Sequence, residues 1–199
     1  MVSLAGRDVR LLRPRDADAL TSQEDFERDE FLPYWADLWP SARALAAVIA
    51  ARALRGARTL ELGCGLGLPS IAAALAGGRV LATDWAADAI EATERNARRN
   101  GVEIETAVVR WQEPDAIVAR APWDLVIGAD LLYEQRNVGL LLELLPRLVD
   151  RRGEVWIADP RRLAAEPFLA AAQGEWERRE QHVAEFPSVT IYRMRRRPD

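Results

Sequence analysis

The chain has 199 residues, of which 49% are apolar and 29% charged, which suits one globular domain with a sizeable core. Its formal net charge of −4 argues against a nucleic-acid binder held by a basic surface. The chain has no run of about 18 apolar residues, so we expect no membrane span. The only cysteine, Cys64, leaves no internal disulfide, and residues 1–10 lack the apolar core of a signal peptide, so we expect a cytoplasmic protein.

Residues 1–33 are polar, and we expect them to form an N-terminal extension or arm before a core at residues 34–199. Weak alternation over residues 7–13 predicts a hairpin there. Residues 24–30 carry a dense run of charge, which is typical of a solvated helix face, a mobile loop or a docking surface for a basic partner. No internal repeat or low-complexity linker divides the chain, so we predict a single domain.

The first elements of the core are predicted to be a helix, a strand and a second helix. The helix covers residues 41–55, with Ser41 as its N-cap and an apolar face along its length. Residues 59–62 form a short buried strand. Pro69 then suits the first turn of the next helix, where a missing N–H group has no cost.

Strands and helices alternate along the rest of the chain. We expect strands over residues 79–83, 103–109, 123–129 and 153–158, and helices over residues 86–99, 137–149 and 166–173. A closing pair of strands is expected at residues 174–185 and 187–195. This alternation predicts a doubly wound, mostly parallel α/β sheet with helices on both faces and an antiparallel pair at the C-terminal end.

A glycine-rich loop with an acid spaced behind it gives the first indication of a ligand. Gly63, Gly65 and Gly67 follow a predicted strand, and glycine lets the backbone approach a ligand closely. Asp84 ends the next strand, nineteen residues after Gly65, a distance at which a carboxylate suits two ribose hydroxyls. A dinucleotide fingerprint would place the third glycine one residue later. The loop, with Glu61 before it, therefore favours S-adenosylmethionine, although the same glycines also fit a tight turn without a ligand.

Polar and aromatic residues stand at four predicted strand ends, where ligands bind in sheets of this kind. Trp85 and Trp111 are placed to flank an adenine ring, and stacking of a base on an aromatic ring contributes about 1–3 kcal/mol in nucleic-acid systems. Either tryptophan could instead fill the core. Ala129, at the end of another predicted strand, is also an expected cofactor contact.

Three segments of the chain resemble one family. Residues 32–41 (Leu-Pro-Tyr-Trp-Ala-Asp-Leu-Trp-Pro-Ser) are similar to the entry motif of the seven-strand protein-lysine methyltransferases, sometimes called family 16. Residues 130–133 (Asp-Leu-Leu-Tyr) match the D-x-x-Y signature of that family. Residues 159–162 (Asp-Pro-Arg-Arg) resemble the D-P-x-R run of the branch that methylates the β subunit of electron-transfer flavoprotein. The resemblance covers about residues 31–195.

This resemblance implies a Rossmann-like, seven-stranded sheet and an S-adenosylmethionine-dependent enzyme that N-methylates lysine side chains of a protein. The cofactor contacts that it implies are Trp39, Gly63, Gly65, Asp84 and Trp111. Asp130 and Tyr133 would lie at the substrate mouth. Relatives often carry an acid before the tryptophan that matches Trp111, whereas this chain has Arg110, so the adenine amine lacks that acceptor.

Methyl transfer needs alignment more than acid–base groups, because the sulfonium already activates its methyl group. A lysine acceptor must also lose a proton, which from a pKa near 10.4 costs roughly 4.6 kcal/mol at pH 7. A partly apolar channel lowers the pKa of an amine, and a carboxylate holds the ammonium on arrival. We therefore assign Asp130 to orienting the amine and Tyr133 to shaping the channel. Asp130 could also be only a cap at a strand–loop junction.

Other functions fit the same pocket, namely a methyltransferase for a small amine or heterocycle, or a non-catalytic module that binds S-adenosylmethionine. A nucleic-acid base methyltransferase is disfavoured, because residues 130–133 lack paired prolines and the chain is acidic. We expect a monomer that acts on a soluble protein with a basic patch, without a nucleic-acid or membrane partner. We expect no metal, because no spaced Cys/His set exists. A Cys64–His182 nucleophile pair is disfavoured by their separation along the chain.

Overall fold

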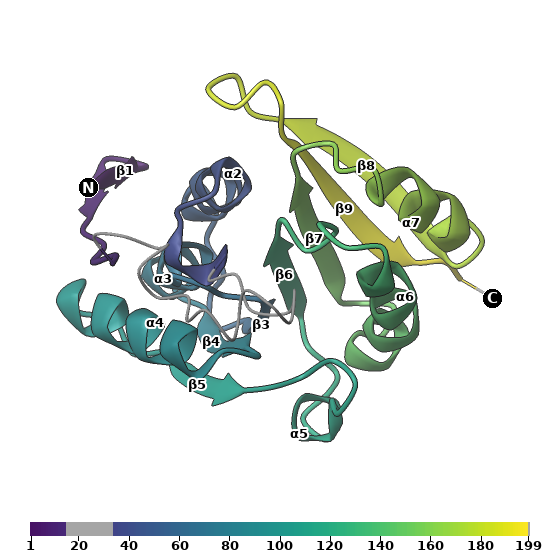
Figure 1. Cartoon of the computed structure of the whole chain (residues 1–199), viewed down its shortest axis with the longest axis horizontal. Helices are drawn as coiled ribbons and strands as arrows, with labels where there is room; N and C mark the ends of the chain where they lie inside the picture. The colour runs from purple at the N-terminus through teal and green to yellow at the C-terminus, as the bar shows by residue number, and fades with distance from the viewer. Residues whose placement is uncertain (15–33, 199) are drawn as a thin grey trace, which may run out of the picture.

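The computed structural model describes residues 1–14 and 34–198. Its main sheet has seven strands: β3 Arg58–Leu62, β4 Arg79–Asp84, β5 Glu105–Val108, β6 Leu125–Ala129, β7 Glu154–Asp159, β8 Trp176–His182 and β9 Thr190–Arg196. They lie in the order β5-β4-β3-β6-β7-β9-β8 (Figure 1). The first five pair in parallel, whereas β9 is antiparallel to both β7 and β8. The predicted mixed sheet with its closing antiparallel pair is confirmed.

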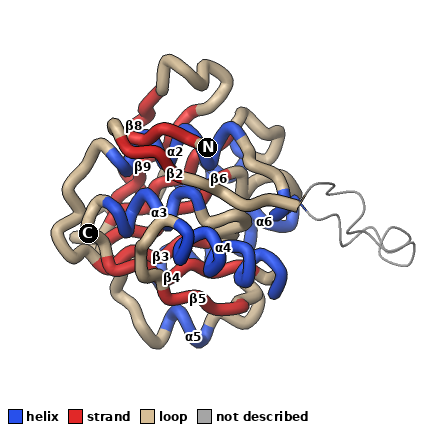
Figure 2. Tube along the Cα trace, turned by 90° about the vertical axis from the view of Figure 1, so that its left-hand side faces the viewer, coloured by secondary structure: helices blue, strands red, loops and turns tan. Residues whose placement is uncertain are grey.

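Helices cover both faces of this sheet. They are α2 Pro40–Ala50, α3 Leu68–Leu75, α4 Ala87–Arg99, α5 Asp115–Val118, α6 Arg136–Leu148 and α7 Ala165–Ala172. The buried residues of α2 and α3 share one apolar cluster, and those of α5, α6 and α7 share another on the opposite face. Helix α4 packs on β4 and β5, and in Figure 2 α3 and α4 cross in front of β3, β4 and β5.

Strand β6 shows why the predicted apolar runs become central strands. Leu125 and Ile127 belong to the cluster of α2 and α3, whereas Val126 belongs to the cluster of α6 and α7. Because successive side chains point to opposite faces, a strand covered by helices on both sides needs apolar residues at every position. The continuous apolar run therefore indicated the middle of the sheet.

The N-terminal segment packs against the core. Its hairpin consists of β1 Val2–Leu4 and β2 Arg7–Val9, so the prediction over residues 7–13 was only partly right. After Val9, the amides of Arg10 and Leu12 donate to the side chains of Asn100 and Asn96 at 2.9 and 2.6 Å. Side chains of α4 and of the residue just after it thus accept the hydrogen bonds that a neighbouring strand would accept in a sheet. The predicted charge run at residues 24–30 lies outside the described residues, and a boundary at residue 33 stays a prediction.

The start and end of α2 differ from the prediction. The helix begins at Pro40 rather than after Ser41, and Trp39 takes the N-cap position without a side-chain cap. Proline is preorganised for the first helical position, so it starts the helix one residue early. Ser41 is then fully buried within the helix, and its Oγ has no partner among the described residues. The helix also ends at Ala50 instead of residue 55.

Candidate functional site

The glycine loop joins β3 to α3 at the carboxyl edge of the sheet. Gly63, Gly65 and Gly67 all have positive φ angles, of 64°, 50° and 79°, which side chains other than glycine rarely adopt. A Cβ at Gly67 would lie 2.8 Å from the side chain of Thr93, and one at Gly65 would lie 3.2 Å from the carbonyl oxygen of Trp35. Glycine is therefore required both by the turn and by the close neighbours of the loop.

Asp84 connects this loop to the end of β4. Its Oδ2 accepts a hydrogen bond from the amide of Gly65 and its Oδ1 accepts one from the amide of Ala86, each at 3.0 Å. The residue is 6% exposed, and burial raises the pKa of its carboxyl. A carboxylate has about four acceptor positions, and the backbone amide of Trp85 also hydrogen-bonds to it, so one position remains for a hydroxyl group such as those of a ribose.

Glu61 lies beneath the glycine loop. It is 1% exposed, and its carboxyl accepts a hydrogen bond from the hydroxyl of Ser70 in the first turn of α3. Burial raises the pKa of Glu61 to about 8, although the bonds from Ser70 oppose this rise. Its contacts hold the start of α3 in place, and its expected contact with a cofactor stays a prediction.

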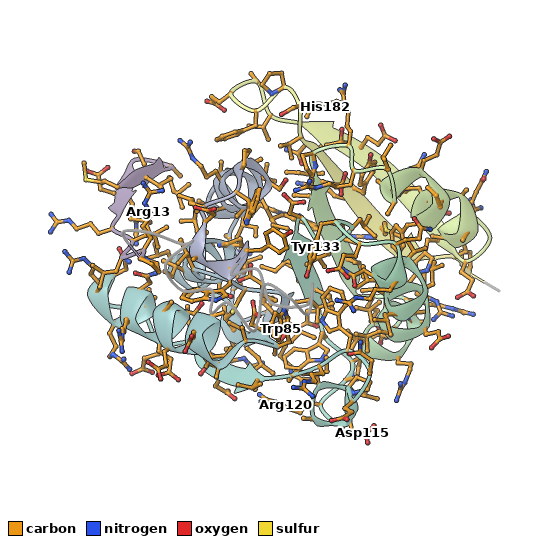
Figure 3. The ribbon with its side chains drawn as sticks, in the orientation of Figure 1. Arg13, Trp85, Asp115, Arg120, Tyr133 and His182 are labelled. Atoms are coloured by element: carbon orange, nitrogen blue, oxygen red, sulfur yellow. The ribbon has the colours of Figure 1, made fainter. Side chains whose placement is uncertain are left out.

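The two tryptophans predicted to flank adenine lie in different environments. Trp85, just after β4, is 40% exposed, whereas Trp111 is partly buried and packs against the cluster of α5, α6 and α7. Figure 3 draws Trp85 near the middle of the molecule, below Tyr133. Trp111 therefore packs on the core, whereas Trp85 is more exposed, and either ring can still offer a face to a base.

Asp130 begins the loop after β6, and Arg162 is its partner. Asp130 has a φ of 60°, and its amide donates to the carbonyl of Ala158 at 2.8 Å. Its Oδ1 accepts from Nε of Arg162 at 2.8 Å, while its Oδ2 is buried without a partner among the described residues. Asp159, at the end of the neighbouring strand, is fully buried and also has one unpartnered oxygen in that part of the chain.

Asp130 and Asp159 face a single guanidinium. The backbone amide of Arg162 donates to Asp159 at 2.7 Å, and burial together with the charge of Asp130 raises the pKa of Asp159. Two carboxylates and one guanidinium leave one formal negative charge. A buried charge of this kind calls for a further cation, so the pair can receive an ammonium group.

Three aromatic rings lie next to one another near Arg162, the partner of Asp130, and we call them, with Asp130, the acceptor mouth. The rings of Tyr34 and Tyr133 are 5.5 Å apart, and those of Tyr34 and Trp39 are 6.2 Å apart. The indole N–H of Trp39 donates to the carbonyl of Tyr34 at 2.8 Å, and the Arg162 guanidinium lies over the Trp39 ring at 5.7 Å. Aromatic faces attract cations.

The glycine loop lies against the residue that follows Asp130. A Cβ at Gly63 would lie 3.0 Å from a methyl group of Leu131, which directly follows Asp130. Burial and the negative charges of Glu134 and Asp84 raise the pKa of Tyr133, so Asp84 acts electrostatically at the mouth. Ala129 is partly buried at the end of β6 and directly precedes Asp130 in the sequence. A ligand at the loop would therefore lie beside the acceptor mouth.

Sequence reasoning assigned no role to Tyr34, Asp159 or Arg162. Tyr34 stood in the quoted entry motif, and the other two stood in the quoted D-P-x-R run, so the signal was present. Their roles depend on distance in space, since Tyr34 is 99 residues before Tyr133 and Arg162 is 32 residues after Asp130. Arg110 is exposed just before Trp111.

The structure gives little geometric support for the Cys64–His182 nucleophile pair that the sequence disfavours. Cys64 is buried, accepts a hydrogen bond from Thr93 at 3.4 Å, and has a pKa raised by burial. Figure 3 draws His182 at the top edge, away from Trp85 and Tyr133. Within residues 1–14 and 34–198, no group of three or more His, Cys, Asp or Glu side chains could hold a metal ion. No helix in the same ranges is long and apolar enough to cross a membrane.

Comparison with known proteins gives matches over most of the chain. The model of a family described as lysine methyltransferase matches residues 22–174. The chain is 35% identical over 148 residues to the electron transfer flavoprotein beta subunit lysine methyltransferase of Xenopus laevis, covering 71% of this chain and 58% of that one. It is 33% identical over 153 residues to EEF1A lysine methyltransferase 3 of Mus musculus, covering 72% and 63%. The matched region thus spans less than two thirds of these relatives.

Solved structures with the same fold are more distant in sequence. The PH0226 protein of Pyrococcus horikoshii OT3 superposes with a TM-score of 0.65 at 15% identity, covering 91% of this chain and 95% of that one. A chain of a fibrillarin/Nop5p complex superposes with a TM-score of 0.61 at 17% identity, covering 80% and 84%. These likenesses show the fold, including the mixed sheet with its interleaved helices.

Proposed function

We propose, since the chain belongs to the lysine methyltransferase family, that it transfers methyl groups from S-adenosylmethionine to lysine side chains of a protein. The cofactor supplies an activated methyl group on its sulfonium. The protein must hold that group, present the acceptor nitrogen in line with it, and exclude competing nucleophiles. We further propose that residues 34–199 act as one domain for this purpose.

The residues at the glycine loop fit the cofactor. The carboxylate of Asp84 keeps an acceptor position beyond its three backbone hydrogen bonds, and a ribose hydroxyl could donate to it. Gly63 and Gly65 are partly exposed, so their backbone can meet a ligand. Trp85 and Trp111 follow the two neighbouring strand ends, where adenine would stack between or against them. Trp39, Glu61 and Ala129 complete our proposed set.

The carboxylate of Asp130 is the observation on which the proposed acceptor chemistry rests. It is buried, its partner Arg162 lies over the ring of Trp39, and its Oδ2 is free of partners among the described residues. An ammonium group would satisfy that oxygen and balance the formal charge that Arg162 leaves uncompensated. A neutral hydroxyl acceptor would satisfy the oxygen but would not balance the charge. The mouth therefore favours a cationic amine.

The acceptor must then give up a proton before it attacks. The rings of Tyr34, Trp39 and Tyr133 form a partly apolar channel, and removal from water lowers the pKa of an amine. Asp130 would draw the ammonium in and orient it, and the aromatic walls would favour the neutral form that reacts. Tyr133 shapes the channel, and its 40% exposure leaves it accessible to the incoming side chain.

A protein acceptor is favoured over a small molecule by the relatives, whose names give the electron transfer flavoprotein beta subunit and EEF1A as the proteins acted on. We propose a soluble protein acceptor for this chain and make no choice between those two. A small amine or heterocycle is the alternative, because the same mouth would accept it. A module that binds cofactor without catalysis is a third candidate.

Labelling in an extract separates these candidates. The purified chain and radiolabelled S-adenosylmethionine are incubated with an extract of source cells that lack the gene, and an Asp130→Ala sample is run in parallel. A labelled protein band that depends on Asp130, with label in ε-N-methyl-lysine after hydrolysis, is expected. Label confined to the small-molecule fraction would support the alternative. Label in neither fraction, with intact cofactor binding, would leave only the non-catalytic module.

A further inference from the structure

A groove lies between α7 and the β8–β9 hairpin, on the same face of the sheet as α6. It has a volume of about 640 Å³ and is lined by residues of the loop after β7, of α7 and of both hairpin strands. Figure 1 shows α7 beside β8 and β9, with the loop after β7 at one end. We call it the arginine groove, after Arg161, Arg162, Arg178 and Arg197 in its lining.

Positive charge dominates this groove. Four guanidinium groups line it, of which that of Arg162 already pairs with Asp130, and Glu166 is the only acid in the lining. Arg161 is exposed and makes no ion pair or hydrogen bond through its side chain within residues 1–14 and 34–198. Arg178 pairs with Glu180 at 3.4 Å, but both side chains are at least 40% exposed, so this pair is weak. The chain as a whole carries a net charge of −4, which makes a local excess of arginine informative.

The groove also has an apolar component. Trp176, Tyr192 and Met194 contribute to its lining and belong to the buried cluster of that face. Leu163, at the edge, is 96% exposed. An exposed leucine beside a basic groove with an aromatic floor suits a partner segment that carries both acidic and apolar side chains.

Arg162 connects the groove to the acceptor mouth. Its side chain lines the groove, pairs with Asp130 and lies over the ring of Trp39. A chain segment that lies in the groove would therefore run directly up to the carboxylate that receives the amine. Arg161, the neighbouring residue, has a φ of 69°, a conformation that costs energy for a residue other than glycine and is frequent at functional sites.

We propose that the arginine groove binds an acidic segment of the methyl acceptor protein, next to the lysine that is methylated, in place of the basic patch expected from the sequence. The proposal rests on the proposed function and adds the chemistry of the acceptor: glutamate or aspartate side chains that meet the guanidinium groups, and an apolar side chain that packs on Leu163. The free lysine would point from this segment past Arg162 to Asp130.

The test compares two charge reversals of equal size. Arg178→Glu with Arg197→Glu changes the groove at its end away from Asp130. Arg179→Glu with Arg99→Glu is the control, because Arg179 is the next residue of β8 on the opposite face and Arg99 lies on α4. The probe is a short fluorescein-labelled peptide of glutamate, leucine, glycine and serine, without lysine. A second peptide has glutamine at each glutamate position.

Fluorescence anisotropy should show that the wild type binds the glutamate peptide and not the glutamine peptide. The groove variant should bind about tenfold more weakly, because two attractions become repulsions, and the control variant should stay within about twofold. The unlabelled glutamate peptide should raise the KM for the labelled acceptor protein and leave the KM for the cofactor unchanged. Equal loss in both variants, or equal binding of both peptides, would overturn the proposal.

The design keeps the two proposals apart, because peptide binding is measured without methyl transfer. If no acceptor is ever labelled but the glutamate peptide binds through the groove, the proposed function fails and the groove assignment stands. If the acceptor is labelled and its KM is the same for the groove variant and the wild type, the groove assignment fails and the proposed function stands.

Discussion

Arg162 donates from Nε to Oδ1 of Asp130 at 2.8 Å, so a cation already holds one oxygen of the carboxylate that faces the acceptor mouth. The other oxygen is buried and has no partner in the described part of the chain. The carboxylate thus has one oxygen held by Arg162 and one buried oxygen that the proposed amine would have to reach. Arg162 acts here as a positioning residue, because it contacts Asp130 and Trp39 rather than the reacting atoms.

Asp130→Asn should lower turnover about 10- to 100-fold, because it removes a charged acceptor of the substrate ammonium worth about 1.5–3 kcal/mol. Steady-state methylation of the labelled acceptor measures the loss, and calorimetry should give a cofactor dissociation constant within about twofold of the wild type. Asp115→Asn is the control, because that side chain is 98% exposed. Turnover equal to the wild type would refute the role of Asp130.

Arg162→Ala should destabilise the protein by about 1–2 kcal/mol, because it leaves Asp130 and Asp159 buried without a counter-charge; the figure is below that for a fully buried pair since the Arg162 side chain is 37% exposed. In an Asp130→Asn background the cost should shrink to about half. Urea unfolding of the four proteins measures the coupling. Arg161→Ala should cost less than about 0.5 kcal/mol. Equal costs of Arg162→Ala in both backgrounds would exclude the coupling.

Asp84→Asn should weaken cofactor binding at least about tenfold. The amides of Gly65 and Ala86 donate to the two carboxylate oxygens of Asp84. An asparagine side chain has no charge, and its NH₂ group would face one of these two donors. Calorimetry measures the dissociation constant, and a thermal melt checks the fold. Asp88→Asn, an exposed acid in the first turn of α4, should leave the constant unchanged. The same constant in both variants would remove Asp84 from the cofactor site.

Trp85→Ala should weaken cofactor binding about fivefold and lower the melting temperature less than Trp111→Ala does, because the exposed ring would stack on adenine. Trp111→Ala should lower both the affinity for the cofactor and the melting temperature, because that ring also packs on the core. Trp111→Leu should restore part of the stability and none of the binding. Unchanged affinity in both alanine variants would mean that adenine is held elsewhere.

The stability of the protein should fall as pH rises from about 4.5 to about 8. Burial raises the pKa of Glu61 from 4.5 to about 8, so in that window the folded state keeps a proton that the unfolded chain has lost. At about 1.36 kcal/mol per pKa unit, the upper bound of this loss is about 5 kcal/mol. Urea unfolding should give parallel curves for wild type and Glu61→Gln near pH 4, with a difference in favour of Gln that grows up to pH 8. A constant difference across the window would contradict the raised pKa.

The glycine loop and the strand ends could be predicted from sequence because their signals are local. Three positive φ angles need glycine within five residues, and Asp84 ends the strand after them. The prediction of Ser41 as a cap was wrong. Pro40 suits the first position of the helix better than Ser41 suits the cap, so the helix begins at Pro40. Helix α5 gave no periodic signal because it has only four residues.

The amino-acid order alone determined a mixed, doubly wound sheet and the turn in which a nucleoside fits, since backbone conformation and apolar alternation are properties of neighbours in the chain. Only the tertiary structure decided that Arg162 pairs with Asp130, that Tyr34 meets Tyr133, and that an arginine-lined groove opens beside them. The Arg162–Asp130 pair and the groove join segments brought together by β6, β7 and β9 lying side by side in the sheet, whereas Tyr34 reaches Tyr133 from the segment before α2. Charge balance and shape at a site depend on distances through space, which no spacing along one segment can give.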